Sequence, residues 1–150
     1  MQTHFPFILG VAVTATLFAM VEIHIEGPRG WAESLPTWRT ENRWTRLFYS
    51  MRPLTGYHLY VQLFVLVFSH VPYATGIVVP SWRIEAKILS FVALFWLLED
   101  FLWFVLNPAF GLKAFKKERI WWHAPTWWWI MPRDYWILAP AGVVLYVLSL

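Results

Sequence analysis

Two acidic residues stand side by side within an apolar segment of the chain. Glu99 and Asp100 occur in LLEDFLWFVLNP, residues 97–108, where their neighbours are mainly Leu, Phe, Trp and Val. An ionisable side chain inside a membrane helix is costly, so such residues normally face other helices, are paired and mark a functional site. We therefore predict that Glu99 and Asp100 are catalytic residues. The alternative is a structural role, as a protonated or Arg-paired packing residue.

Further carboxylates and imidazoles lie near the ends of other apolar segments. Glu22 and Glu26 are four residues apart and share a helix face, His58 begins a later apolar run, and His123 lies in a tryptophan-rich loop segment. Carboxylate and neutral imidazole groups bind Zn²⁺, Fe²⁺ or Mn²⁺. We predict these four residues as ligands of such a divalent metal, although their spacing matches no known motif. Without metal, a neutral carboxylic acid among these groups would donate a proton, and a second carboxylate would stabilise positive charge.

The composition predicts a membrane protein. Of 150 residues, 59% are hydrophobic and only 14% are charged, which is unlike an ordinary soluble domain. The apolar residues form blocks that approach the ~20 residues needed for a membrane-spanning helix. The absence of cysteine excludes disulfides and thiolate metal sites. The net charge of +3 is explained by loops next to a membrane, and the chain has no nucleic-acid motif, so we expect no nucleic-acid partner.

These blocks predict an all-α, polytopic integral membrane helical bundle with three to four transmembrane helices in a single domain. Pro72 is expected to kink the second helix. The last apolar run is short, since its fifteen residues from Trp136 span only ~22 Å. The predicted helices cover residues 5–25, 57–79, 84–107 and 135–150, and the predicted loops cover residues 26–56 and 108–134.

The basic residues predict the orientation of the bundle. Ten of the twelve Lys and Arg residues fall in the two long loops, and only Arg83 and Lys87 fall elsewhere. Short cytoplasmic loops collect basic residues. We therefore expect a multi-pass protein of the cell membrane, with both long loops in the cytoplasm and the N-terminus outside. The six predicted site residues would then all lie toward the cytoplasmic side.

Tryptophan is the most unusual residue of the composition, with twelve copies. We interpret the dense group in residues 121–136 as an interfacial belt at the headgroup level. The alternative is that some of these rings line a groove for a lipid or isoprenoid chain, or face a cationic intermediate. The Lys113 to Arg119 cluster is expected to contact anionic headgroups of membrane lipids.

The segment LLEDFLWF resembles a short acidic motif of the small integral-membrane lycopene cyclase domain family. In that motif Pro, any residue and two acidic residues precede a Phe-rich apolar stretch. Glu99, Asp100, Phe101 and Phe104 match it, whereas Leu97 replaces the proline. The resemblance implies proton-initiated ring closure of a polyene, with Glu99 and Asp100 as the acid and the cation stabiliser.

The leading hypothesis is a small membrane-embedded enzyme with a cytoplasm-facing, metal-binding Glu/Asp/His site, acting on a hydrophobic lipid or isoprenoid substrate. One alternative is an acid-catalysed, carotenoid-type cyclase without metal. Another is a non-catalytic accessory or assembly subunit, working as a homo-oligomer or with a membrane protein partner. The accessory role predicts that the acidic and histidine residues are distributed among separate helix contacts. A proton or metal-ion carrier would need polar groups on the outer side, where few are available.

Overall fold

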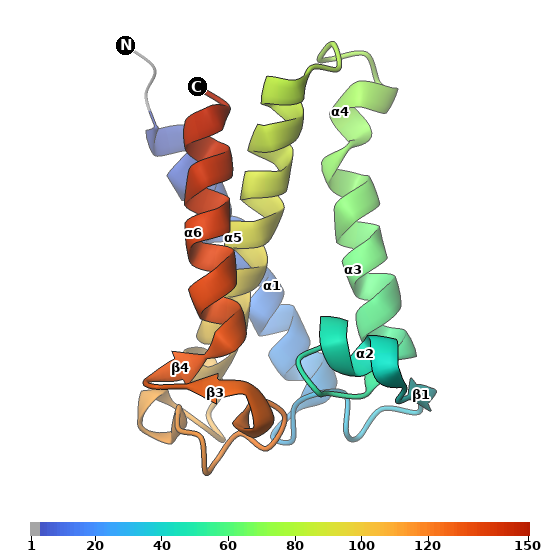
Figure 1. Cartoon of the computed structure of the whole chain (residues 1–150), viewed down its shortest axis with the longest axis vertical. Helices are drawn as coiled ribbons and strands as arrows, with labels where there is room; N and C mark the ends of the chain where they lie inside the picture. Colours follow the sequence, from blue (N-terminus) through green and yellow to red (C-terminus); the bar gives the residue numbers. More distant parts are fainter. Residues whose placement is uncertain (1–3) are drawn as a thin grey trace.

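The structure is a computed structural model that describes residues 4–150, and it is mostly helical, as predicted (Figure 1). Two pairs of two-residue strands form small antiparallel ribbons in the loops. The α-helices are α1 (Phe5–Glu26), α2 (Arg43–Phe48), α3 (Gly56–Ser69), α4 (Val71–Ala74), α5 (Trp82–Leu106) and α6 (Arg133–Leu148). The short 3-10 helices are η1 (Leu112–Ala114) and η2 (Ala124–Thr126). The strands are β1 (Arg39–Thr40) paired with β2 (Leu54–Thr55), and β3 (Trp127–Trp128) paired with β4 (Met131–Pro132).

Two of the described helices are long and apolar enough to cross a membrane. These are α1, with 22 residues, and α5, with 25 residues. The 14 residues of α3 and the 16 residues of α6 fall short of the ~20 that a membrane crossing requires. The structure thus has two candidate spans, where the sequence predicted three to four.

The second predicted helix is not continuous over residues 57–79. Helix α3 ends at Ser69, His70 interrupts the helix, and the single turn of α4 follows. The cause is Pro72, which has no N–H group and whose ring would clash with the carbonyl of Phe68 in a regular helix. The proline therefore breaks the helix two residues before its own position, whereas the sequence predicted a kink within one long helix.

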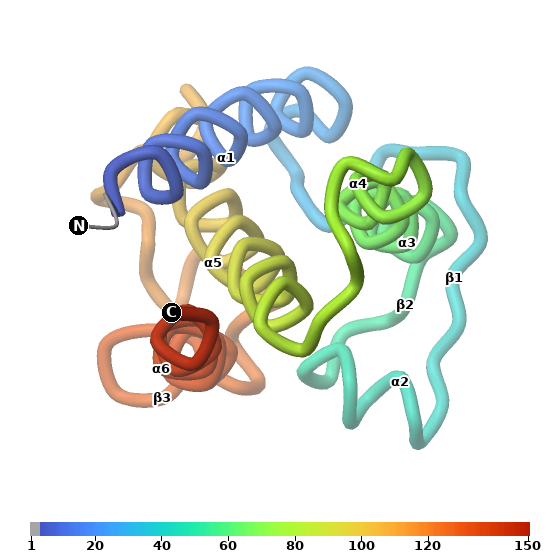
Figure 2. The backbone as a smooth tube through the Cα atoms, turned by 90° about the horizontal axis from the view of Figure 1, so that it is seen from above, coloured from blue at the N-terminus to red at the C-terminus, as the bar shows by residue number. Residues whose placement is uncertain are grey.

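The helices run between two ends of the molecule (Figure 1). Both long loops lie at one end, whereas the C-terminus, the start of α1 and the α4–α5 connection lie at the other. Helix α5 packs against α1 on one side and α6 on the other, and α3 stands apart from this group (Figure 2). The fully buried Ala15 and Ala19 allow α1 to pack closely. The Ser90 hydroxyl donates a hydrogen bond to the carbonyl of Gly142 across α5 and α6, at 2.7 Å.

An aromatic core closes the loop end of the bundle. Trp103 and Phe104 of α5 pack against Trp122 there, and Trp122 is only 4% exposed. Trp122 is therefore a core residue instead of part of a headgroup belt, whereas Trp128 and Trp129 are exposed. This core joins the second long loop to α5 and so positions the polar residues that follow Trp122.

Candidate functional site

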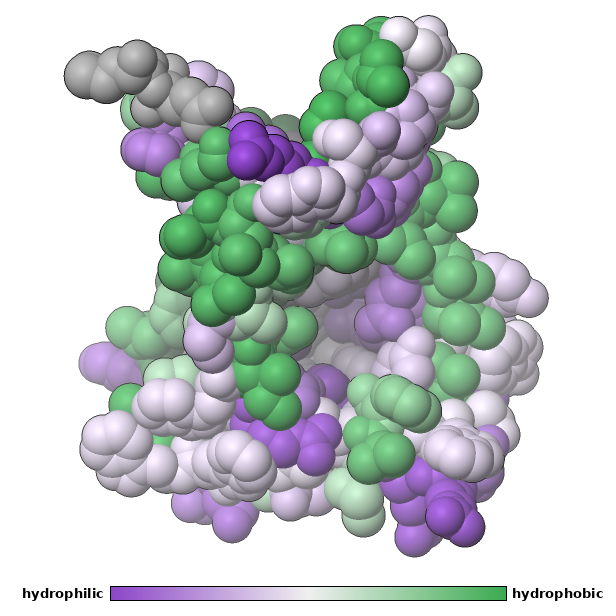
Figure 3. Space-filling model, turned by 45° about the horizontal axis from the view of Figure 1, so that its top comes forward, coloured by the Kyte–Doolittle hydropathy of each residue, from purple (hydrophilic) through white to green (hydrophobic). Residues whose placement is uncertain are grey.

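A cavity of about 540 Å³ lies between the helices at the loop end of the bundle. Figure 3 shows a hollow in the middle of one face, with hydrophilic residues inside it and hydrophobic residues above it. Residues from α1, α3, α5, α6 and both long loops line the cavity. All six predicted site residues are among them: Glu22, Glu26, His58, Glu99, Asp100 and His123.

Helix α1 contributes two buried carboxyl groups from its last turn. The Tyr57 hydroxyl donates a hydrogen bond to Glu22 Oε1 at 3.0 Å. The backbone N–H of Ala32 donates to Glu26 Oε1 at 2.5 Å. Ala32 and Trp31 both have left-handed backbone conformations, with φ of 52° and 47°. Non-glycine residues rarely adopt this conformation, and here it accompanies an N–H directed at a buried carboxyl group.

The buried His58 ring is held from two directions. Thr55 is the N-cap of α3: its Oγ1 accepts a hydrogen bond from the His58 backbone N–H at 3.1 Å and lies 2.7 Å from the ring Nδ1. The other ring nitrogen, Nε2, lies 3.5 Å from Glu26 Oε1. The Trp31 ring stacks on the imidazole with 3.9 Å between centroids.

Glu99 faces the carboxyl groups of α1. It is 3% exposed and its carboxyl group lies beside that of Glu22. Its Oε1 atom is buried and has no hydrogen-bond partner in the part of the chain that the structure describes. Two neighbouring carboxyl groups can share a single proton. This pair is therefore suited to releasing or accepting a proton.

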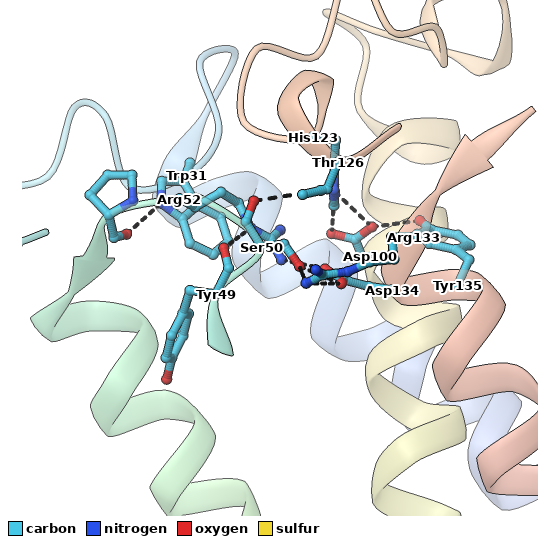
Figure 4. Close-up of polar contacts among 11 residues, drawn as sticks. Trp31, Tyr49, Ser50, Arg52, Asp100, His123, Thr126, Arg133, Asp134 and Tyr135 are labelled. Atoms are coloured by element: carbon cyan, nitrogen blue, oxygen red, sulfur yellow. Dashed lines mark hydrogen bonds and ion pairs between the residues drawn. The ribbon is translucent and has the colours of Figure 1, made fainter. Parts of the chain in front are cut away.

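Asp100 points to a different set of neighbours, as expected for adjacent residues of a helix. Its Oδ2 lies 3.2 Å from Nε2 of the buried His123 and accepts a 2.5 Å hydrogen bond from the Tyr135 hydroxyl (Figure 4). Within residues 4–150, the buried His123 Nδ1 has no hydrogen-bond partner. Asp100 thus holds the Nε2 side of the ring, and Nδ1 is left for another group in the cavity.

A second polar cluster lies beside Asp100 (Figure 4). Arg52 forms an ion pair of 2.7 Å with Asp134, and its guanidinium lies 4.2 Å from the centre of the Trp31 ring. The Ser50 hydroxyl donates to Asp134 and accepts a hydrogen bond from Arg133 at 2.7 Å. Burial lowers the pKa of the Arg52 guanidinium, and the neighbouring Asp134 carboxylate opposes this effect.

Sequence reasoning missed several residues of the site. Arg52 was interpreted as one of many basic loop residues near the membrane, and Asp134, Tyr57 and Tyr135 were not singled out. The proximity of Tyr57 to His58 in the chain was one available signal. The contacts of Arg52 and Asp134 join residues 82 positions apart, so no local pattern could have revealed them.

The metal prediction has no assembled ligand set to support it. Within residues 4–150, no group of three or more His, Cys, Asp or Glu side chains is arranged to hold a metal ion. Glu22, Glu26 and His58 lie on one side of the cavity, whereas His123 pairs with Asp100.

Comparison with known proteins adds no further assignment. The chain matches no family model, and neither the curated proteins nor the solved structures include one that is significantly similar to it. The resemblance to lycopene cyclase domains thus depends on LLEDFLWF alone, and it stays a prediction.

Proposed function

We propose that this chain is a small membrane-embedded enzyme that performs acid–base chemistry on a lipid or isoprenoid substrate. One observation carries the proposal: the six residues selected for their chemistry, scattered over residues 22–123, line the same cavity. Ionisable groups buried among apolar helices are costly, and they persist where a site requires them. Perturbed, convergent titratable groups in a cavity are typical of active sites.

The geometry suggests distinct roles for the two acidic residues of α5. Glu99 has an unpartnered oxygen beside Glu22, so this pair is positioned to exchange a proton with a substrate group. Asp100 instead acts on His123, whose free Nδ1 would serve as a base. A proton donor and a proton acceptor in one cavity are the two components of general acid–base catalysis.

The accessory-subunit alternative predicted acidic and histidine residues in separate helix contacts. Their grouping around one cavity supports an enzyme instead. The ion pair of His70 with Glu85, at 3.1 Å near the other end of α3, is the type of isolated contact that the accessory role predicted. It lies outside the cavity.

Our proposal includes the multi-pass topology, with the cavity facing the cytoplasm. Its support is that both long loops, which hold ten of the twelve basic residues, lie at the same end of the bundle (Figure 1). In this proposal, α1 and α5 each cross the membrane. A third crossing is formed by α3 together with α4, and a fourth by α6.

The test compares the lipids of membranes that contain the protein or its variants. Cells expressing wild type, Glu99→Gln or His123→Gln are extracted, and their lipids are compared by mass spectrometry. Glu118→Gln is the matched control, because Glu118 is exposed in a loop and does not line the cavity. We expect a lipid change with wild type and the control that both site variants lose. Identical lipids in all four strains and in cells without the protein would contradict the enzyme proposal.

A measurement of bound metal separates proton chemistry from metal-assisted chemistry. The protein is purified in mild detergent without chelators, and metals are quantified by elemental mass spectrometry, together with Glu99→Gln and His58→Ala. We expect no stoichiometric metal. One metal per chain, lost in both variants, would replace acid–base chemistry by the metal-assisted reaction predicted from the sequence.

A further inference from the structure

A second, apolar cavity of about 810 Å³ lies between α1, α3 and α5. Phenylalanine and valine side chains dominate its lining, among them Phe18, Val65, Phe91 and Phe95. Its lining residues on α3 face those on α1 and α5 across the cavity. We refer to it as the apolar groove.

The apolar groove and the polar cavity lie on the same helix faces. On α5 the residues Phe91 and Phe95 line the groove and Glu99 lines the cavity, each four residues after the last. On α1, Phe18 of the groove precedes Glu22 of the cavity by the same spacing. Residues four apart lie above one another on a helix. The groove therefore continues the polar cavity along the axis of the bundle.

The apolar groove offers almost no polar group to a ligand. The hydroxyl groups that line it, of Thr14 and Ser69, donate their hydrogens to backbone carbonyls. Thr14 donates to Gly10 and Ser69 to Leu66, each at 2.7 Å. Among the described residues, Lys87 is the one charged side chain that lines the groove, and it lies twelve residues before Glu99, about 18 Å along the helix. A long hydrocarbon chain matches a lining of this composition and length.

The polar cavity limits the head group that such a chain can carry. Five acidic residues line it, but only two arginines, and Asp134 pairs with Arg52. Arg133 also pairs with Asp134, and Asp100 pairs with His123. Glu22, Glu26 and Glu99 remain beside the space for the ligand. Carboxyl oxygens are hydrogen-bond acceptors that repel the negative oxygens of a phosphate, so a phosphate head group is disfavoured relative to a hydroxyl or an amine.

We propose, on the basis of the proposed function, that the apolar groove binds the hydrocarbon chain of the substrate while an uncharged or cationic head group enters the polar cavity. The substrate class is then a long-chain alcohol or amine, with an acyl or isoprenoid tail. The head group would lie beside Glu99 and Glu22, at the position where the two cavities meet.

The test uses a fatty alcohol that carries a photoactivatable diazirine in its chain, with the matching alkyl phosphate as the comparison. Purified full-length protein in lipid nanodiscs is irradiated, and labelled peptides are mapped by mass spectrometry. We expect the alcohol to label groove residues, and the phosphate to label them about tenfold less, which corresponds to 1.4 kcal/mol.

Matched tryptophan variants locate the site on α3. Val65→Trp fills the apolar groove. Val67→Trp is the control, because Val67 is 68% exposed and does not line the groove. Groove labelling should fall about tenfold in Val65→Trp and remain unchanged in Val67→Trp. Val21→Trp fills the groove from α1 and should repeat the loss even if Val65→Trp does not fold.

Several results would overturn the inference. Labels spread evenly over all lipid-facing helices would indicate surrounding lipid only, and cross-links between two copies through the groove would indicate a dimer contact. Equal labelling by alcohol and phosphate would refute the head-group assignment. Groove labelling that persists in Glu99→Gln while no lipid changes in cells would support the binding site and contradict the enzyme. A lipid change that persists in Val65→Trp would contradict substrate binding in the groove and leave the enzyme proposal in place.

Discussion

The ion pair between Arg52 and Asp134 is expected to stabilise the fold strongly. The two side chains are only 11% and 23% exposed and lie 2.7 Å apart. Removing one partner of a buried pair costs about 3–5 kcal/mol, because the other charge is left uncompensated. Asp134 would keep its bond from Ser50 and the nearby Arg133, so we expect Arg52→Met to cost about 3 kcal/mol, at the lower end of this range.

A double-mutant cycle with Asp134→Asn measures the interaction itself. The free energy of unfolding in detergent micelles is determined by denaturant titration for the wild type, both single variants and the double variant. Because each single variant already removes the pair, the double variant should lose about 2 kcal/mol less than the sum of the two. Arg52→Lys should recover only part of the loss, since lysine cannot reproduce the planar stacking on Trp31.

The chain offers a matched control for this experiment. Arg46 also forms an ion pair of 2.9 Å, with Glu41, but both side chains are about half exposed, at 53% and 48%. Exposed pairs contribute about 0–1 kcal/mol, so Arg46→Met should change the free energy of unfolding by less than about 1 kcal/mol. Equal losses in Arg46→Met and Arg52→Met, or simple additivity in the cycle, would refute the reasoning.

Four further substitutions, one of them a control, test the surroundings of the site by the same unfolding titration. Thr55→Val removes the cap of α3 and should cost about 1 kcal/mol; no loss would contradict the capping role. Gly30→Ala should cost about 1–3 kcal/mol more than the control Gly27→Ala. Both glycines have a left-handed backbone, with φ of 66° and 68°. The new Cβ would lie 2.5 Å from Trp122 at position 30, whereas it would meet no atom within 4 Å at position 27. Equal losses would show that the indole moves aside. Glu99→Gln should leave the fold intact or stabilise it by about 0.5–2 kcal/mol. The reason is that a buried carboxyl group kept for function costs stability in the folded protein. A large loss of stability would indicate a structural role.

The helical class and the residues with unusual chemistry can both be predicted from the amino-acid sequence. Long apolar blocks predict helices because only a helix satisfies its own backbone hydrogen bonds in an apolar environment. Glu99 and Asp100 stood out for a related reason, since a charge in such a block must find partners elsewhere in the fold. The different directions of these two residues also followed from helix geometry alone.

The contacts between the groups of the site depend on how the helices and loops pack. A helix that is apolar on nearly all sides gives no signal for its rotation, so the approach of Glu99 to Glu22 could not be predicted. The polar cluster of Arg52 and Asp134 depends on loop residues such as Ser50 and Met51, whose left-handed backbones are imposed by their surroundings. Long-range packing overrides local preference at such positions, and that packing forms the cavity.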